Sequence, residues 1–330
     1  MNTDKFGQRM SGVLLAWVAA GGPLHAQTAA TGAGQPYPQK PVRIVVPFSA
    51  GGASDIIARM LAADLTETFG QNVMVDNRGG AGTVLGTEIV ARAPADGHTL
   101  LVNTPSYTIN AGVRKLPYDS INDFAAVGLI AVTALLLITH PSLPVRSVKD
   151  LLALARSQPG QLIYASSGQG SPTHMGMELL RFAGVRMTHV PYKGAAPALT
   201  DLVGGHVQLM QTSVIVAKPH TSTGRLRAIA VTTARRTAAM PEVPTMAETI
   251  PGYEVLNWWG LMAPAKTPAL VIERLNTEVA KVMAKSANRE RLGAEGVEAA
   301  SGTPADFVVM LRNESAKWGK VGKAIGLKLD

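Results

Sequence analysis

Three short stretches of the sequence combine small residues, hydroxyl side chains and the start of an apolar helical pattern. They are PFSAGGASD at residues 47–55, YASSGQGSPTH at 164–174 and VPYKGAAPALTD at 190–201. Each predicts a strand, a tight turn and the first turn of a helix. Small residues let backbone N–H groups approach a ligand there, and the helix dipole favours negative charge. The three stretches together predict a site for an anionic group.

Neutral hydroxyl groups occur in these turns, and the polar side chains there have more than one possible role. The serines that could donate to an anion are Ser49, Ser54, Ser166, Ser167 and Ser171. The alternative is that each stretch is an ordinary helix start, because glycine and serine begin helices in many proteins. For His174, packing or capping is the main alternative to ligand contact. Asp55 is expected to pair with the helix dipole rather than to act as a general base.

One cation and one aromatic pair also stand out. Lys193 is the only clear formal cation in the three stretches, either as a solvated side chain or as a partner for a distal carboxylate. A carboxylate held by neutral donors and helix dipoles needs no such partner. Trp258 and Trp259 could line a ligand pocket, but an aromatic pair in this position is more often packing.

Several chemistries are disfavoured by what the sequence lacks. There is no cysteine, which removes thiolate catalysis, disulfides and thiolate metal sites. No P-loop motif, G-x-S-x-G elbow or H-E-x-x-H pair is present. The run GGAGTVLG at 79–86 resembles a dinucleotide fingerprint only in its glycine content. We therefore expect no catalytic centre, no metal and no cofactor.

The formal net charge of +8 is spread along the chain. A phosphate footprint needs clustered Lys and Arg, so nucleic acid is not expected as a partner. An anionic small ligand is compatible with this balance.

The N-terminus has the order of a secretory signal. Lys5 and Arg9 precede an apolar run at 13–20 that is too short to span a bilayer, and small Ala26 precedes Gln27. The sequence predicts a signal peptide at 1–26, a flexible mature N-terminus at 27–39 and a location in the periplasm.

Strands and helices alternate from Val42 onward, which predicts an α/β fold with parallel strands in doubly wound sheets. The apolar run at 124–139 is interpreted as a buried strand or a strand passing between domains. The alternation then begins again, and three amphipathic helices with no strand between them follow from Pro264. If these helices pack back on the first block, the chain crosses twice between two hinged lobes.

These residues and their order resemble the Bug family, the periplasmic substrate-binding proteins of the tripartite tricarboxylate transporter type (TctC-like). The likeness runs from about Tyr37 to the C-terminus and rests on eight blocks. They include YPQKPVRIVVPFSAGGASDIIARMLA, GQNVMVDNRGGAGTVLGTEIVARAPADGHTLL, HVPYKGAAPALTDLVGGHVQLM and WWGLMAPAKTP.

The resemblance implies a two-lobe periplasmic binding protein of the Venus-flytrap, type II-like kind, with two interdomain crossovers. We expect lobe 1 at 40–132 and 259–330, and lobe 2 at 133–258. A monomer would then capture a small organic carboxylate between the lobes and deliver it to inner-membrane transporter subunits. The ligand-binding residues that the resemblance implies are Phe48, Ser49, Ala50, Gly51, Gly52, Asp55, Ser106, Ser166, Ser167, Gly168, Ser171, His174, Tyr192, Lys193, Gly194 and Ala195.

Departures from the family pattern leave the identity of the carboxylate open. The family usually reads PGG where this chain has SAGG, and Gln211 and Thr212 stand where Phe and an Asp are common. Two other roles are compatible with the sequence. One is a sensor subunit that presents a ligand to a membrane signalling system. The other is a secreted α/β enzyme with Asp55 and His174 as its acid–base pair.

Overall fold

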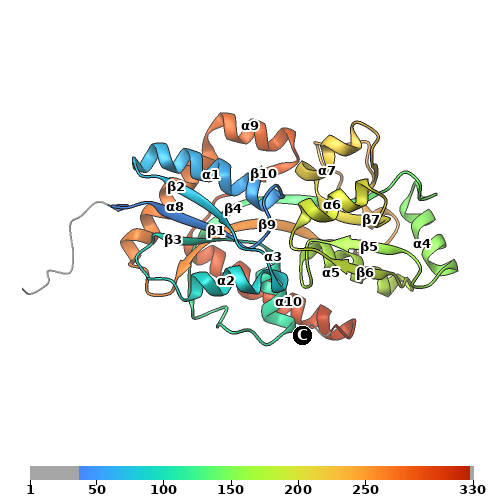
Figure 1. Cartoon of the computed structure of the whole chain (residues 1–330), viewed down its shortest axis with the longest axis horizontal. Coiled ribbons are helices and arrows are strands. Elements are labelled where there is room, and N and C mark those ends of the chain that lie inside the picture. The colour runs from blue at the N-terminus through green and yellow to red at the C-terminus, as the bar shows by residue number, and fades with distance from the viewer. Residues whose placement is uncertain (1–36, 328–330) are drawn as a thin grey trace, which may run out of the picture. The chain divides into compact units, whose positions relative to one another are not determined.

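The first strand–turn–helix block forms as the alternation predicts. In the computed structural model, which describes residues 37–327, strand β1 lies parallel to both β2 and β3. We call this block and the helices on it the first lobe (Figure 1). Its elements are β1 (Val42–Val46), α1 (Ala53–Phe69), β2 (Val73–Asn77), the short 3₁₀ helix η1 (Ala81–Thr83), α2 (Val84–Ala91), β3 (Thr99–Asn103) and α3 (Pro105–Val113).

The second block repeats the arrangement and forms the second lobe. Strand β5 is parallel to β6 and β7, again as expected for strands joined by helices. Its elements are α4 (Val148–Ser157), β5 (Ile163–Ser166), α5 (Pro172–Leu179), η2 (Leu180–Ala183), β6 (Thr188–Pro191), α6 (Ala195–Val203), β7 (Leu209–Ser213), α7 (Val214–Thr221), β8 (Arg227–Val231) and η3 (Met246–Glu248).

Two long antiparallel strands connect the lobes. Strand β4 (Phe124–Thr139) pairs with β9 (Leu256–Pro264) as far as Ala134, and with β7 and β8 from Leu135 onward. The strand order is β2-β1-β3-β9-β4-β7-β5-β6, so β4 belongs to both sheets. The run at 124–139 is therefore a buried strand that passes between the lobes. The lobe boundaries at 132/133 and 258/259 stay a prediction.

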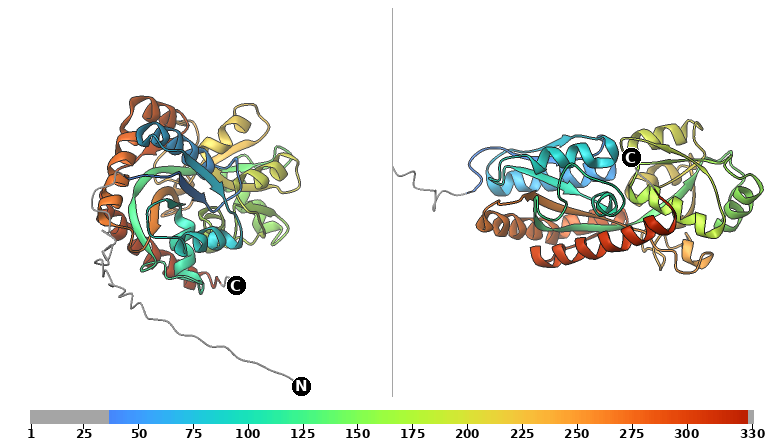
Figure 2. Two further views of the ribbon diagram at one scale, coloured as in Figure 1. Left: turned by 60° about the vertical axis from the view of Figure 1, so that its left-hand side comes forward. Right: turned by 90° about the horizontal axis from the view of Figure 1, so that it is seen from below.

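The C-terminal helices pack back on the first lobe. Helix α8 (Ala269–Ala284) contacts α1 and β4, and α10 (Pro304–Ala324) contacts α3. Figure 2 shows α10 running along one side of the sheets toward the second lobe. Trp318 and Ile325 accordingly join a core cluster with Leu151 and Met175 of that lobe.

One expectation about this region is wrong. A short strand, β10 (Val297–Ala299), lies between α9 (Ser286–Ala294) and α10 and pairs antiparallel with β4. Its three residues are too few to produce a readable alternation in the sequence.

The predicted signal peptide at 1–26 lies outside the described residues, as does 27–36 of the predicted mature N-terminus. At Tyr37 the side chain packs edge-on against Phe69, and its hydroxyl donates to Gly97 O over 2.6 Å. Tyr37 lies in the predicted flexible segment 27–39, three residues before the predicted start of the first lobe, and is packed on that lobe. Among residues 37–327, no helix is long and apolar enough to cross a membrane.

Candidate functional site

A small cavity lies where the two lobes meet. Its volume is about 40 Å³, room for about three water molecules. The residues that line it are Phe48, Gly52, Ala53, Ser54, Thr104, Leu135, Ser167, Pro172, Thr173, Ala195, Thr212, Ser213, Asn257 and Trp259. The lining contains no formally charged side chain.

Five helices direct their N-terminal ends at this cavity. Ala53 opens α1, Thr104 caps α3, Pro172 opens α5, Ala195 opens α6 and Ser213 caps α7. The first N–H groups of a helix have no partner inside the helix, and each dipole places partial positive charge at that end. The convergence makes the cavity electropositive without any cationic side chain, which suits an anion.

The first predicted stretch forms part of the wall. Phe48 and Gly52 line the cavity, while Ala50 and Gly51 are exposed. Asp55 turns back to its own loop, where its carboxylate accepts from Gly51 N and from Arg59 Nε, each over 3.0 Å. Burial raises the pKa of Asp55, but the hydrogen bonds from Arg59, Gly51 and Asn77 outweigh it and hold that pKa below its usual value. The lowered pKa makes the Asp55 carboxylate a weaker base, and its hydrogen bonds hold its own loop, so this geometry does not favour a general-base role.

The second stretch contributes Ser167 to the cavity lining. Ser166 lies behind it, with its Oγ 2.6 Å from His189 Nε2, and Gly168 N donates to that same hydroxyl over 3.1 Å. Ser171 is the N-cap of α5, because its Oγ accepts from His174 N over 3.1 Å.

His174 belongs to an aromatic stack beneath this loop. Its ring lies 4.1 Å from that of His189, which in turn stacks on Tyr164 at 4.8 Å. Burial, followed by the charge of Arg114, lowers the pKa of His174 to about 4. Burial and the neighbouring His174 lower the pKa of His189 to about 3. Both rings are neutral at pH 7 and support the loop from behind.

The third stretch closes against the first. Ser49 N donates to Lys193 O over 2.8 Å, and the Lys193 side chain is exposed. Gly194 has φ +150°, and a β-carbon there would lie 2.3 Å from Ser49 Oγ, so only glycine fits this approach. Ala195 lines the cavity, whereas the Tyr192 hydroxyl donates to Asp201 over 2.5 Å.

Several lining residues were not among the predicted ones. Ser106 is buried beside the N-cap Thr104, but Thr104 is the residue of that loop that lines the cavity. Ala53, Ser54, Pro172 and Thr173 line the cavity from within the first two predicted stretches, and Trp259 was considered for a ligand pocket. The lining residues outside these predictions are Leu135, Thr212, Ser213 and Asn257. The N-cap signal could have indicated Thr104, whereas no local signal places β4 and β9 at the cavity.

Trp258 and Trp259 are neighbours in strand β9, so their side chains point to opposite faces of the sheet. Trp259 lines the cavity and donates from Nε1 to Ser54 Oγ over 3.0 Å. Trp258 faces the other side and packs edge-on against Phe307, with ring centroids 5.7 Å apart. Trp258 is therefore a packing residue, as expected, whereas Trp259 both packs and lines the cavity.

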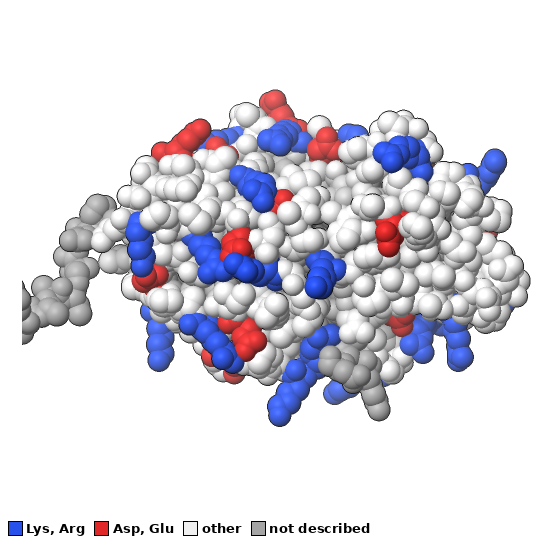
Figure 3. All heavy atoms as spheres, in the orientation of Figure 1, with Lys and Arg blue, Asp and Glu red and all other residues white. Residues whose placement is uncertain are grey.

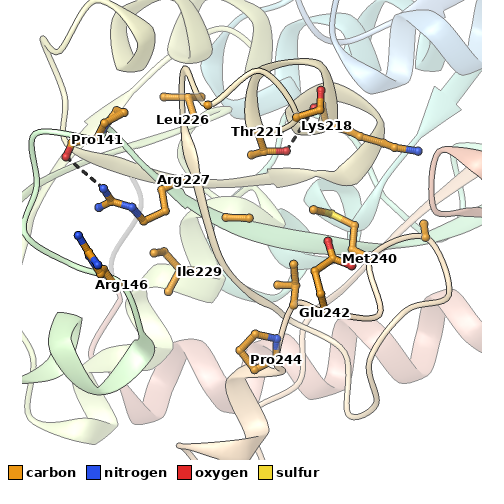
Figure 4. Close-up of a pocket in the computed structure, with 15 residues that line it drawn as sticks. Pro141, Arg146, Lys218, Thr221, Leu226, Arg227, Ile229, Met240, Glu242 and Pro244 are labelled. Carbon is orange, nitrogen blue, oxygen red and sulfur yellow. Dashed lines mark hydrogen bonds between the residues drawn. The ribbon is translucent and has the colours of Figure 1, made fainter.

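A larger hollow of about 610 Å³ lies in the second lobe (Figure 4). It borders Lys218 and Thr221 at the C-terminal end of α7, where the helix dipole is negative. Two arginines line it, Arg146 and Arg227, and the guanidinium group of Arg227 donates to the carbonyl oxygens of Leu143 and Val145, at 3.1 and 2.9 Å. The hollow contains none of the predicted residues, so we place the candidate site in the smaller cavity.

One face of the molecule has the scattered charge that the sequence predicts. On the face drawn in Figure 3, Lys and Arg are scattered among Asp and Glu and form no continuous basic patch. This face carries no clustered footprint of the kind that nucleic acid requires.

Comparison with known proteins agrees with this geometry. Residues 57–327 match the family described as "Tripartite tricarboxylate transporter family receptor". A Pseudomonas sp. protein named "UPF0065 protein in tcbD-tcbE intergenic region" is 40% identical over 289 residues, 86% of each chain. "Protein BugT" of Bordetella pertussis is 33% identical over 96% of this chain and 97% of its own.

Solved structures with the same fold include two with a bound acid in their titles. "R. palustris Rpa4515 with adipate" has a TM-score of 0.85 and 39% identity, and covers 88% of this chain and 99% of its own. "MatC (Rpa3494) from Rhodopseudomonas palustris with bound malate" has a TM-score of 0.83 and 32% identity, with coverage of 86% and 99%. The two-lobe α/β fold is thus that of periplasmic binding proteins, and the chain belongs to the tripartite tricarboxylate transporter receptor family, with Bug proteins among its relatives.

Proposed function

We propose that the protein captures a small organic carboxylate between its lobes and delivers it to the inner-membrane subunits of a tripartite tricarboxylate-type transporter. The observation that carries the proposal is the convergence of five helix N-termini on one cavity with a neutral lining. Charge-assisted hydrogen bonds from backbone N–H groups are strong, and helix dipoles reinforce them. A carboxylate would be held without an ion pair.

The ligand class that fits best is a dicarboxylate of about four to six carbons. Two similar proteins carry adipate and malate in their titles, and both are dicarboxylic acids. Contacts from both walls at once, such as Phe48 and Ser54 opposite Ser167 and Ala195, would let the ligand stabilise the closed form. The cavity has a volume of about 40 Å³ in this structure, so it would have to widen when such a ligand enters.

The binding role also implies a location. We expect export through a cleaved signal peptide, a mature chain that begins at Gln27, and a monomer in the periplasm. Intact-mass measurement on a periplasmic extract tests the cleavage site. Recovery of the uncleaved chain in the cytoplasm would contradict the export proposal.

A thermal-shift screen followed by calorimetric titration tests the binding role. The screen contains C4–C6 dicarboxylates, tricarboxylates and acidic amino acids, with the diamide of each best acid as the matched neutral control. A ligand that binds only the folded state raises the melting temperature. We expect a shift with dicarboxylates, none with diamides, and unchanged ligand after incubation. Formation of product would favour the enzyme alternative, and no shift with any acid would refute the proposed ligand class.

A further inference from the structure

Two hydroxyl groups face the cavity from opposite lobes, and each has a donor already bound to its oxygen. On the first lobe, Ser54 Oγ accepts the indole N–H of Trp259 over 3.0 Å. Both residues are buried, with Ser54 8% and Trp259 0% exposed. Because an indole N–H can only donate, the direction of this bond is fixed. The Ser54 hydroxyl hydrogen is left to point elsewhere, and Ser54 lines the cavity.

On the second lobe, three hydroxyls form a chain that ends at the cavity. Thr173 Oγ1 lies 2.9 Å from Ser171 Oγ and 3.0 Å from Ser167 Oγ. Ser167 N also donates to Thr173 Oγ1 over 3.0 Å, and His174 N donates to Ser171 Oγ over 3.1 Å.

Burial sets the direction of this chain. Ser171 is 1% exposed, and among residues 37–327 the only acceptor within reach of its hydroxyl hydrogen is Thr173 Oγ1. A buried hydroxyl hydrogen without an acceptor costs about 1–3 kcal/mol, so Ser171 donates to Thr173. Thr173 then accepts from Ser171 and from Ser167 N, which fills both lone pairs, and it donates to Ser167 Oγ. The hydrogen of Ser167 is left for the cavity that Ser167 lines.

We propose that Trp259 and the Ser171–Thr173 pair are positioning residues that make Ser54 and Ser167 hydrogen-bond donors toward the ligand. Opposite walls then present O–H donors, so the site selects a group that offers only acceptors, an ionised carboxylate. This inference rests on the proposed function and deepens it, because it explains how neutral side chains discriminate an acid from its amide. The effect of Trp259 and Thr173 passes through the serine that each one bonds.

The test is calorimetric titration of the whole mature protein with the dicarboxylate that gives the largest thermal shift, beside its monoamide. Trp259→Phe keeps the ring and removes the N–H, and Thr173→Val keeps the shape and removes the hydroxyl. Each should weaken acid binding about tenfold and reduce the preference for acid over monoamide. Thr173→Ser should restore binding, because it restores the hydroxyl.

Two controls distinguish positioning from packing. Trp258→Phe makes the same chemical change on the other face of β9 and should leave affinity within twofold of wild type. The double variant Trp259→Phe with Ser54→Ala should bind no more weakly than Ser54→Ala alone. Additive losses, or equal effects of the two tryptophan variants, would overturn the inference while wild-type binding stands. A wild-type protein that binds no carboxylate would refute the proposed function and this inference with it.

Discussion

Substitution of Gly82 by alanine should prevent the lobes from closing fully. Gly82 lies in the η1 turn of the first lobe with φ +62°, and a β-carbon there would lie 2.2 Å from Gln169 O of the second lobe. That separation is roughly 1 Å shorter than a C···O contact of about 3.3 Å. The opposing atom is backbone, so no side-chain rotation relieves the overlap. The loops have to move apart.

The free-energy cost of Gly82→Ala has two parts. An alanine in the left-handed region costs about 1 kcal/mol relative to glycine in any conformation of the lobes. Separation of the loops by about 1 Å would also break interlobe contacts such as the 2.8 Å hydrogen bond from Ser49 N to Lys193 O. Loss of that bond and of the packing around it should disfavour the closed form by about 2 kcal/mol, which is about a thirtyfold loss of affinity.

A matched control isolates the clash. Gly70 at the end of α1 has the same φ of 62°, and a β-carbon there has no heavy atom within 4 Å. Gly82→Ala and Gly70→Ala should therefore lower the free energy of unfolding of the unliganded protein by similar amounts in urea titrations. Only Gly82→Ala should weaken ligand binding in calorimetry and expand the liganded protein in small-angle scattering. Equal affinities for the two variants would refute the argument that closure brings Gly82 against Gln169.

Three further outcomes are expected. Lys193→Ala should weaken ligand binding less than tenfold, because the side chain is exposed and the interlobe bond uses its carbonyl oxygen; a hundredfold loss in calorimetry would instead indicate an ion pair. Thr232→Val should lower the free energy of unfolding by about 2 kcal/mol in urea, because its buried hydroxyl bonds the backbone of both crossover segments; an unchanged midpoint would contradict this. The free energy of unfolding should fall as pH falls from 6.5 toward 4. The pKa values of His174 and His189 lie below 6.5 in the folded protein, so the unfolded chain takes up more protons in this range. His174 alone should contribute about 2 kcal/mol between pH 7.5 and 5, and urea titrations of His174→Gln at both pH values should show a smaller difference than wild type.

Local chemistry made the helix entries readable from the sequence. Ser171 followed by Pro172 is a sequence typical of an N-cap and the first helical position, and the structure has that cap. Thr245 and Glu248 likewise have the spacing of a capping box, and the structure has that box. These features depend on residues within three or four positions of each other, so their energies are set before the chain folds. The run at 124–139 was also recognisable, because a strand buried on both faces needs continuous apolar residues.

The cavity itself depends on contacts that are distant in the chain. Trp258 and Trp259 have the same local pattern, and alternation says only that they face opposite sides. Which side meets Ser54 depends on the register of β9 against β4, a pairing across more than a hundred residues. Thr212 and Asn257 enter the lining for the same reason.

The sequence by itself determined the α/β class, the three glycine and serine turns and the family resemblance. Each of these depends on residues close together in the chain or on the identity of single residues. Only the tertiary structure decided that five helix N-termini share one cavity, that Asp55 turns back to its own loop, and that Ser54 and Ser167 line the same cavity from different lobes. The physical reason is that a helix start specifies a local dipole, whereas its target is set by how sheets pack and how two crossover strands hold the lobes.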